Sequence, residues 1–294
     1  MNNTSLHTYA ASVASEHGED GIIAEIFNRI GAANKWCVEF GALNGTHDSN
    51  TWNLIVNKGW EGVLIEADKT YFEKLTEVYQ GNPRAHCFNE FIEYEGEHSI
   101  DSILSRTQIP KDFDLLSIDI DGSDYHVWNS LARYTPRLVV IEFNPTIPDD
   151  VEFVQPRDMS VFQGSSLRST VLLANQKGYE LVLVNETNAF FVLKELFPLC
   201  GVEDNSIENL HSDHSLETKL FQLYDGTLMI AGNTKLVWHN IPIDVQKLQV
   251  LPEHKRKYPA FIPQKGAIRS LKYVVRKMPV YPALMRLRNW IKSR

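Results

Sequence analysis

The chain has 294 residues, of which 43% are hydrophobic and 22% charged, and this is typical of a globular protein that can bury a large core. It contains no apolar run near the roughly 20 residues of a membrane span and no basic segment followed by an apolar one at its start, so we expect neither a membrane span nor a secretory signal. Three widely separated cysteines exclude a disulfide scaffold and favour a cytoplasmic protein.

The charges are distributed unevenly along the chain. Residues 1–254 contain all 37 acidic residues and 17 of the 29 Lys and Arg, a formal charge of −20. The last forty residues contain the other twelve Lys and Arg and no acidic residue, a formal charge of +12. A basic tail of this kind is suited to an anionic surface or to the acidic body of the same chain.

Helical and strand patterns alternate through the first two thirds of the chain. Apolar residues at helical spacing predict helices at 20–30, 49–58, 70–79, 99–106, 125–133 and 166–177. Short apolar runs predict strands at 36–40, 62–65, 85–88, 113–118 and 138–143, with a closing antiparallel pair at 180–184 and 189–193. This alternation predicts an α/β fold with a Rossmann-like, doubly wound, mostly parallel sheet of seven strands.

Four segments are expected along the chain. They are an N-terminal helical segment (1–34), a Rossmann-like domain (35–195), a loop and hairpin extension (196–254) and a basic amphipathic tail (255–294). In the extension, residues 227–231 and 235–239 are predicted to pair around Gly232 and Asn233. His211 and His214, which flank Asp213 in a weakly patterned loop, are predicted to lie at the surface.

A glycine-bearing loop follows the first predicted strand. It reads Glu39-Phe40-Gly41-Ala42-Leu43-Asn44-Gly45, and glycines allow a close approach of backbone to a ligand. No Lys or Arg lies between residues 37 and 57, so the loop suits a cationic ligand better than a phosphate. We expect Glu39, Gly41 and Gly45 to hold the amino-acid end of S-adenosylmethionine, with Glu39 facing its ammonium group and the next helix start facing its carboxylate. A tight strand–helix turn without a ligand is the alternative.

The second and third predicted strands end in residues that would complete an adenosyl site. Glu66 ends the second strand and is placed to accept hydrogen bonds from ribose hydroxyls. Ala67 and Asn89 are the further residues expected to bind this cofactor. Asp68 is better explained as the N-cap of the following helix.

Acidic residues and an asparagine end the fourth and fifth predicted strands. Asp119 and Asp121 follow the fourth strand, and Glu142 and Asn144 follow the fifth. Neighbouring strands would bring the four side chains to one point, where their oxygens suit Mg²⁺ or Mn²⁺. A hydrogen-bonded site without metal is equally open. Asp119, Asp121 and His126 are the predicted catalytic groups, although a histidine near a helix start is more often a surface residue.

Two other functions fit parts of the same pattern. The string Asp119-Ile120-Asp121-Gly122-Ser123 is similar to the haloacid-dehalogenase phosphatase motif, with Asp119 as nucleophile, but three strand–helix units precede it. An EF-hand loop is excluded because Asp124 stands at its sixth position and Ser130 at its twelfth. The other function is that of a catalytically silent binding module.

Several strings recur in a fixed order over roughly residues 15–240. They are His17-Gly18-Glu19-Asp20-Gly21, Val38-Glu39-Phe40-Gly41, Leu64-Ile65-Glu66, Ser117-Ile118-Asp119-Ile120-Asp121-Gly122-Ser123-Asp124-Tyr125, Val140-Ile141-Glu142-Phe143-Asn144, Gly164-Ser165-Ser166-Leu167, Asn188-Ala189-Phe190-Phe191-Val192 and Tyr224-Asp225-Gly226-Thr227. Together they resemble FkbM-like S-adenosylmethionine-dependent methyltransferases, in the branch associated with bacterial surface polysaccharides. Asp121 stands where better-known members carry Glu, and those members lack the Asn144 position. Metal-dependent sugar and catechol O-methyltransferases do carry an Asp after the fourth strand and an Asp-Asn pair after the fifth.

The resemblance implies methyl transfer to a sugar hydroxyl of a surface polysaccharide or glycolipid. It also implies that the alternative, a catalytically silent binding module, would belong to a polysaccharide assembly complex. A cytoplasmic enzyme is expected, with residues 265–294 contacting the cytoplasmic face of the inner membrane through a basic helix that carries Tyr281, Leu284, Leu287, Trp290 and Ile291 on one face. Nucleic acid is not an expected partner because the body is strongly acidic. The sequence gives no indication of the oligomeric state.

Overall fold

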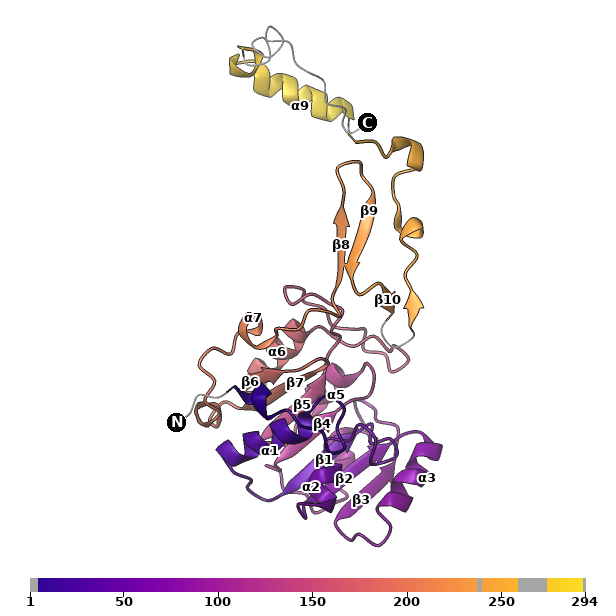
Figure 1. The fold of residues 1–294 in the computed structure, drawn as a ribbon, viewed down its shortest axis with the longest axis vertical. Helices are drawn as coiled ribbons and strands as arrows, with labels where there is room; N and C mark the ends of the chain where they lie inside the picture. Colours follow the sequence, from indigo (N-terminus) through magenta and orange to yellow (C-terminus); the bar gives the residue numbers. More distant parts are fainter. Residues whose placement is uncertain (1–4, 237–239, 259–273, 293–294) are drawn as a thin grey trace. The chain divides into compact units, whose positions relative to one another are not determined.

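The computed structural model describes residues 5–236, 240–258 and 274–292 (Figure 1). They fall into two compact units, one within residues 1–220 and 230–243 and the other within 221–229 and 244–294. Every residue predicted above to bind cofactor, metal or acceptor lies in the first unit. Residues 265–273, 293 and 294 of the predicted membrane-contacting tail lie outside the described residues.

The first unit is built around one seven-stranded sheet. Its strands are β1 (Trp36–Phe40), β2 (Glu61–Glu66), β3 (Ala85–Asn89), β4 (Leu115–Ile118), β5 (Leu138–Glu142), β6 (Tyr179–Val184) and β7 (Asn188–Leu193). Their order is β3-β2-β1-β4-β5-β7-β6, and β7 runs antiparallel to both of its neighbours while the other pairs are parallel. This confirms the predicted Rossmann-like, mostly parallel sheet of seven strands, including the closing antiparallel pair.

Helices cover both faces of this sheet. They are α1 (Glu19–Ile30), α2 (Trp52–Val56), α3 (Lys69–Val78), α4 (Ile100–Leu104), α5 (Asp124–Ser130), α6 (Leu167–Gln176) and α7 (Ile207–Leu210), with short 3₁₀ helices at Leu6–Tyr9 and Phe197–Leu199. All six predicted helices are present. Helix α2 is shorter than predicted because the Ser49 and Thr51 side chains and the Asn50 main chain bond to Glu39 instead of extending the helix.

Successive strand residues enter two separate hydrophobic cores. Val38 and Phe40 join the core that contains residues of α4, α5 and α6, whereas Cys37 joins the core that contains residues of α1, α2 and α3. The alternation follows from the two-residue period of a strand. Since both faces are covered, the carboxyl edge of the parallel strands is the part of the sheet that stays open to a ligand.

A buried carboxylate connects the amino ends of the central strands, at the edge opposite the carboxyl ends. Asp114, which is fully buried before β4, accepts hydrogen bonds from the main-chain N–H groups of Ala33, Asn34 and Lys35 and pairs with Arg137 at 2.9 Å. These bonds join the entries to β1, β4 and β5. The alignment of the three strands at this end determines where their carboxyl ends finish.

The extension pairs differently from the prediction. Strand β9 (Leu228–Gly232) pairs with β8 (Thr218–Gln222), and β10 (Lys235–Leu236) pairs with β11 (Ile241–Pro242), so the predicted pairing of 227–231 with 235–239 is wrong. The cause is the turn at Asp225 and Gly226, where Asp225 accepts hydrogen bonds from the N–H and hydroxyl of Thr227. Residues 237–239 lie outside the described residues.

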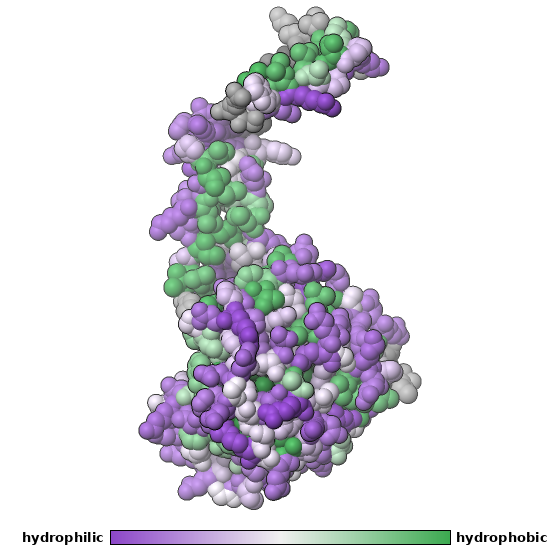
Figure 2. All heavy atoms as spheres, turned by 180° about the vertical axis from the view of Figure 1, so that it is seen from behind, coloured by the Kyte–Doolittle hydropathy of each residue, from purple (hydrophilic) through white to green (hydrophobic). Residues whose placement is uncertain are grey.

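The second unit includes short 3₁₀ helices at Val245–Leu248 and Glu253–Lys255 and a helix, α9 (Tyr281–Lys292). Pro282 occupies the first turn of α9, where its missing N–H has no helical partner to lose. Leu284, Leu287, Trp290 and Ile291 are exposed, and Figure 2 shows hydrophobic and hydrophilic side chains together on this helix. No helix among the described residues is long and apolar enough to cross a membrane.

Candidate active site

A cavity of about 650 Å³ lies at the carboxyl edge of the sheet. Its walls come from the ends of β1, β2, β4 and β5 together with the segment before α1 and the loop before β7. Seven of the predicted site residues line it, namely Glu39, Gly41, Glu66, Ala67, Asp119, Asp121 and Glu142. Because ligands bind at the carboxyl ends of parallel strands, most of the predicted site residues line this one cavity.

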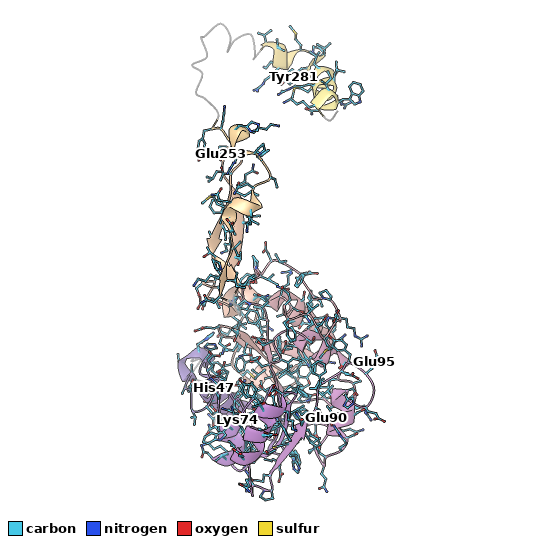
Figure 3. The ribbon with its side chains drawn as sticks, turned by 90° about the vertical axis from the view of Figure 1, so that its right-hand side faces the viewer. His47, Lys74, Glu90, Glu95, Glu253 and Tyr281 are labelled. Atoms are coloured by element: carbon cyan, nitrogen blue, oxygen red, sulfur yellow. The ribbon has the colours of Figure 1, made fainter. Side chains whose placement is uncertain are left out.

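The cavity wall is strongly acidic. Eleven carboxylates line it: Glu16, Glu19, Glu39, Asp48, Glu66, Asp68, Glu90, Asp119, Asp121, Glu142 and Glu186. His17 is its one histidine among the described residues, and no Lys or Arg belongs to that lining. Figure 3 labels Glu90, which pairs outside the cavity lining with Arg106 at 2.8 Å. Such a wall attracts cations and disfavours free anions.

Glu39 organises the loop that follows β1. Its buried carboxylate accepts hydrogen bonds from the Ser49 and Thr51 hydroxyls, both at 2.7 Å, and from the N–H of Asn50 at 2.6 Å. The Asn50 side chain continues to Ser117, the residue opposite Glu39 on β4. Burial raises the pKa of Glu39, while these hydrogen bonds oppose the rise. Three of its roughly four acceptor positions are thus taken by the protein.

Glu66 joins two loops of the predicted adenosyl site. One carboxylate oxygen accepts from the N–H of Leu43 at 2.8 Å and the other from the N–H of Asp68 at 2.7 Å. Burial raises the pKa of Glu66. The Ala67 main chain also bonds to this carboxylate, which leaves about one of its roughly four acceptor positions for a ribose hydroxyl. Asp68 accepts from the N–H groups of Thr70 and Tyr71 and so caps α3, as predicted.

The two loop glycines have packing reasons for their positions. Gly41, with φ +69°, lies so close to β4 that an added Cβ would meet the main-chain oxygen of Asp119. At Gly45, with φ +79°, an added Cβ would meet Leu75 and Tyr79 of the helix α3 region. Gly41 lines the cavity and Gly45 does not. Their expected role in cofactor binding stays a prediction.

Asn89 lies behind the cavity wall instead of on it. Its side-chain amide donates to the main-chain oxygens of Glu66 at 2.8 Å and Ala67 at 3.1 Å. Glu90, the next residue, lines the cavity. Asn89 therefore shapes the strand end that presents Ala67.

The predicted carboxylate cluster is assembled at one point. Asp119, Asp121 and Glu142 each place one oxygen so that all three lie within 4.8 Å of one another. Surrounding protein, together with the charges of Asp124 and Asp121, raises the pKa of Asp119 well above its usual range. The oxygens match the donor set that Mg²⁺ and Mn²⁺ prefer, and a divalent ion would relieve their mutual repulsion.

Asp124 holds the loop that carries two of these carboxylates. Its two oxygens accept from the N–H groups of Ile120 and Gly122, both at 2.9 Å. Burial raises the pKa of Asp124 to about 6. Asp121, inside this loop, has φ +58°, which is unusual for a residue with a side chain. The structure thus holds strained backbone at the cavity.

Asn144 and His126 do not reach the cavity lining. The amide oxygen of Asn144 accepts from the N–H and hydroxyl of Thr146, and its amide nitrogen donates to the Gln163 carbonyl at 2.6 Å. His126 bonds through Nε2 to the carbonyl of Gln155 at 2.8 Å. Asn144 was expected to point the same way as Glu142, as alternate residues of an extended strand do. Strand β5 ends at Glu142, however, and the side chain of Asn144 closes the following turn instead of joining the carboxylate cluster.

Residues before α1 complete the wall and were missed as site residues. His17 lines the cavity, and its Nδ1 lies 3.7 Å from Glu186. Glu19, which also lines the cavity, accepts from the N–H of His17 and from the side chain of Asn185. The string His17-Gly18-Glu19-Asp20 can be read from the sequence, but the packing of this segment decides that His17 and Glu19 line the cavity. His47, by contrast, is 72% exposed (Figure 3).

Comparison with known proteins confirms the resemblance noted in the sequence. Residues 88–181 match the family model of the methyltransferase FkbM domain. This span contains the Asp119–Asp124 loop and Glu142. Among curated proteins, no sequence matches the chain significantly.

Solved structures similar to this chain include methyltransferases. Magnesium protoporphyrin IX methyltransferase from Synechocystis PCC 6803, with bound S-adenosylmethionine, is 11% identical over 60% of this chain and 77% of its own, with a TM-score of 0.37. The N-terminal domain of EvdMO1 with bound S-adenosylhomocysteine is 13% identical over 59% and 79%, with a TM-score of 0.38. A methyltransferase from Clostridium acetobutylicum is 10% identical over 58% and 89%, with a TM-score of 0.37.

Proposed function

We propose that this protein is an S-adenosylmethionine-dependent O-methyltransferase whose acceptor is a sugar hydroxyl of a surface polysaccharide or glycolipid. One observation carries the proposal: the segment that matches a methyltransferase domain contributes a carboxylate cluster to the cavity at the carboxyl edge of the sheet. The cavity's acidic lining, without Lys or Arg among its described residues, suits a cofactor that carries a positive sulfonium.

The cofactor would lie across the ends of β1 and β2. Glu66 would accept a hydrogen bond from a ribose hydroxyl, and the Gly41–Leu43 segment would pass beside the methionine part. Glu39, which lines the same cavity, has roughly one acceptor position left for the ammonium group. S-adenosylmethionine supplies the methyl group from its sulfonium, because the positively charged sulfur leaves readily as a neutral thioether.

The acceptor hydroxyl would lie against Asp119, Asp121 and Glu142. A divalent ion held by these carboxylates would bind the hydroxyl and lower its pKa. Without an ion, a carboxylate of the cluster or His17 would take the proton. In either case an O–C bond forms as the S–C bond breaks, giving a methyl ether and S-adenosylhomocysteine. Positioning the three reacting atoms in line would supply much of the rate.

The proposal is tested first by cofactor binding. Isothermal titration with S-adenosylmethionine should show one site per chain, and Glu66→Gln should weaken binding by about tenfold, the effect of losing roughly one charged hydrogen bond. Glu95→Gln, at a side chain that is 80% exposed and outside the cavity lining, is the matched control. Absence of binding to the wild-type protein would favour the silent binding module.

The acceptor is tested separately from the cofactor. Radiolabelled methyl transfer to a bacterial envelope fraction, followed by mild acid hydrolysis, should yield O-methylated sugar. A phosphatase would instead release phosphate from model phosphoesters and lose this activity in Asp119→Asn. The acidic lining speaks against that alternative, because phosphate esters are usually held by cationic groups.

We also propose that the basic tail brings the enzyme to the cytoplasmic face of the inner membrane. The support is the exposed apolar residues of α9 interspersed with Arg286, Arg288 and Lys292. This combination fits an anionic lipid surface, where a lipid-linked acceptor would be presented.

A further inference from the structure

A second group of metal-ligating side chains lies in the first unit, separate from the carboxylate cluster at the cavity. Asp149 follows β5, His211 ends α7, and His214 lies in the loop before β8. Each offers one ligand atom such that all three atoms lie within 4.8 Å of one another. None of the three lines the large cavity. The predicted surface position of His211 is wrong, since only 2% of this residue is exposed.

The distances within this group suit a small tetrahedral ion. His211 Nδ1 lies 2.8 Å from Asp149 Oδ1, and His214 Nδ1 lies 3.9 Å from Asp149 Oδ2. Ligand atoms around a tetrahedral Zn²⁺ with bonds near 2.0–2.1 Å are about 3.3 Å apart. The two separations lie about 0.5 Å below and about 0.6 Å above that value.

Glu217 lies beside His214 and is the candidate for a fourth ligand. Its Oε1 lies 2.6 Å from His214 Nδ1, while its Oε2 is held by Lys219 at 2.7 Å. The carboxylate is 5% exposed and so is fixed in this position. Asp149, His211 and His214 lie together, and the carboxylate of Glu217 is bonded to one of the two imidazoles. This nitrogen and oxygen donor set, from two chain segments, suits Zn²⁺ better than Mg²⁺.

The buried imidazole of His211 gives an independent indication. Its Nε2 has no hydrogen-bond partner among the described residues, and such a buried polar atom is uncommon. His211 also lines a second cavity of about 200 Å³, whose other walls include Asn185, Ser212 and Asp213. With an ion on Nδ1, the proton moves to Nε2, and a water molecule in this polar cavity can accept it.

We propose that Asp149, His211, His214 and Glu217 form a structural Zn²⁺ site. The ion takes the place of the proton on Nδ1 of each histidine, which otherwise lies between Nδ1 and a carboxylate. It thereby links the turn after β5 to the segment after α7. Leu216, between two of the ligands, lines the large cavity, so the ion also fixes part of that wall. The site does not depend on the proposed methyl transfer.

The test measures metal content and stability of the full chain. Metal-stripped protein is incubated with Zn²⁺, desalted and analysed by elemental analysis, and its thermal unfolding is followed with and without the ion. Wild type should retain one zinc more per chain than His214→Ala, and Zn²⁺ should raise the unfolding temperature of the wild type but not that of the variant. His214 is 40% exposed, so its replacement should leave the fold intact.

Two controls separate this site from its surroundings. His86→Ala removes a histidine that pairs with a single acid, Glu61, at 3.3 Å, and should retain the zinc. Asp121→Asn alters the oxygen cluster at the large cavity and should also retain it. Co²⁺ gives a further readout, because a tetrahedral nitrogen–oxygen site absorbs visible light far more strongly than an octahedral oxygen site. If His214→Ala and Asp149→Asn keep the zinc and the cobalt spectrum of the wild type, the four residues form only an imidazole–carboxylate network and the proposal is wrong.

Discussion

The main-chain oxygen of Asp119 lies only 1.8 Å from the place that a Cβ on residue 41 would occupy. Gly41 directly follows β1 and Asp119 directly follows β4, and the two strands are neighbours in the sheet. The missing side chain at Gly41 thus allows the main chain of Asp119, a predicted catalytic residue, to lie directly beside the predicted cofactor loop. This contact between main chains links the two halves of the site.

Gly41→Ala should therefore destabilise the protein strongly. Main-chain atoms of a central strand cannot move away, so the expected loss in the free energy of unfolding is about 3 kcal/mol or more. Gly59→Ala is the matched control, because Gly59 has φ +70° and nothing within 4 Å of an added Cβ. That variant should lose only about 1–2 kcal/mol, the cost of the left-handed conformation. Equal losses in urea unfolding would contradict the steric explanation.

Asp114→Ala should cost about 3–5 kcal/mol in the free energy of unfolding. The change leaves the charge of Arg137 and three main-chain N–H groups without their buried acceptor. Glu95→Ala breaks an ion pair of similar length with Arg157, but both of its side chains are more than half exposed, so the expected change is within about 0.5 kcal/mol. Chemical denaturation of both variants checks the difference.

Metal removal provides a test of the carboxylate cluster. If Asp119, Asp121 and Glu142 hold Mg²⁺ or Mn²⁺, a chelator should lower the rate of methyl transfer and added ion should restore it. Asp121→Asn should abolish the stimulation by added ion, whereas Asp204→Asn, at an exposed residue outside the cavity lining, should preserve it. Transfer that is indifferent to both chelator and ion would show that the cluster works without metal.

The cysteines should react slowly with alkylating reagents at mildly alkaline pH. Burial raises the pKa of Cys87 and of Cys200 to about 11 and that of Cys37 well above its usual range. A raised pKa means less thiolate, so at pH 8 alkylation should be about a hundredfold slower than for a free cysteine with a pKa near 8.5. The rate for Cys87 should rise as the pH approaches 11. Mass spectrometry of iodoacetamide-treated folded protein measures it, and rapid labelling at pH 8 would contradict the expectation.

Charge reversal on α9 tests the proposed membrane contact. The double change Arg286→Glu and Arg288→Glu should weaken binding to vesicles of anionic lipid by at least about tenfold, because each basic residue near such a surface contributes roughly 1 kcal/mol. Lys58→Glu, at an exposed residue of the first unit, should have little effect. Vesicle sedimentation at low and physiological salt checks both. Unchanged binding of the double variant would assign the tail another partner.

The strand ends of the site could be predicted because they depend on short-range patterns. The apolar runs before Glu39, Glu66, Asp119 and Glu142 identify strands, and the crossover rule places the ends of parallel strands at one edge. That is enough to predict the convergence of Asp119, Asp121 and Glu142. It is also enough to place Asp68 at the start of α3, since an N-cap is a local interaction.

Other parts of the site depend on contacts between distant segments. Asn144 was expected beside Glu142, but its amide closes a turn with Thr146. His17 lines the cavity because the segment before α1 packs over the loop that carries Glu186. The partner of His211 is Asp149, 62 positions away, and not the adjacent Asp213. No periodicity encodes such pairings.

The sequence by itself determined the alternation of strands and helices, the order of the acidic strand ends and the absence of Lys and Arg from the loop after β1. Each follows from residue spacing along the chain. Only the tertiary structure decided which acidic side chains face the cavity, which are consumed in holding loops, and which histidines are buried. Those outcomes depend on turn geometry and on packing between segments far apart in sequence, where the burial of each polar group must be matched by a specific partner.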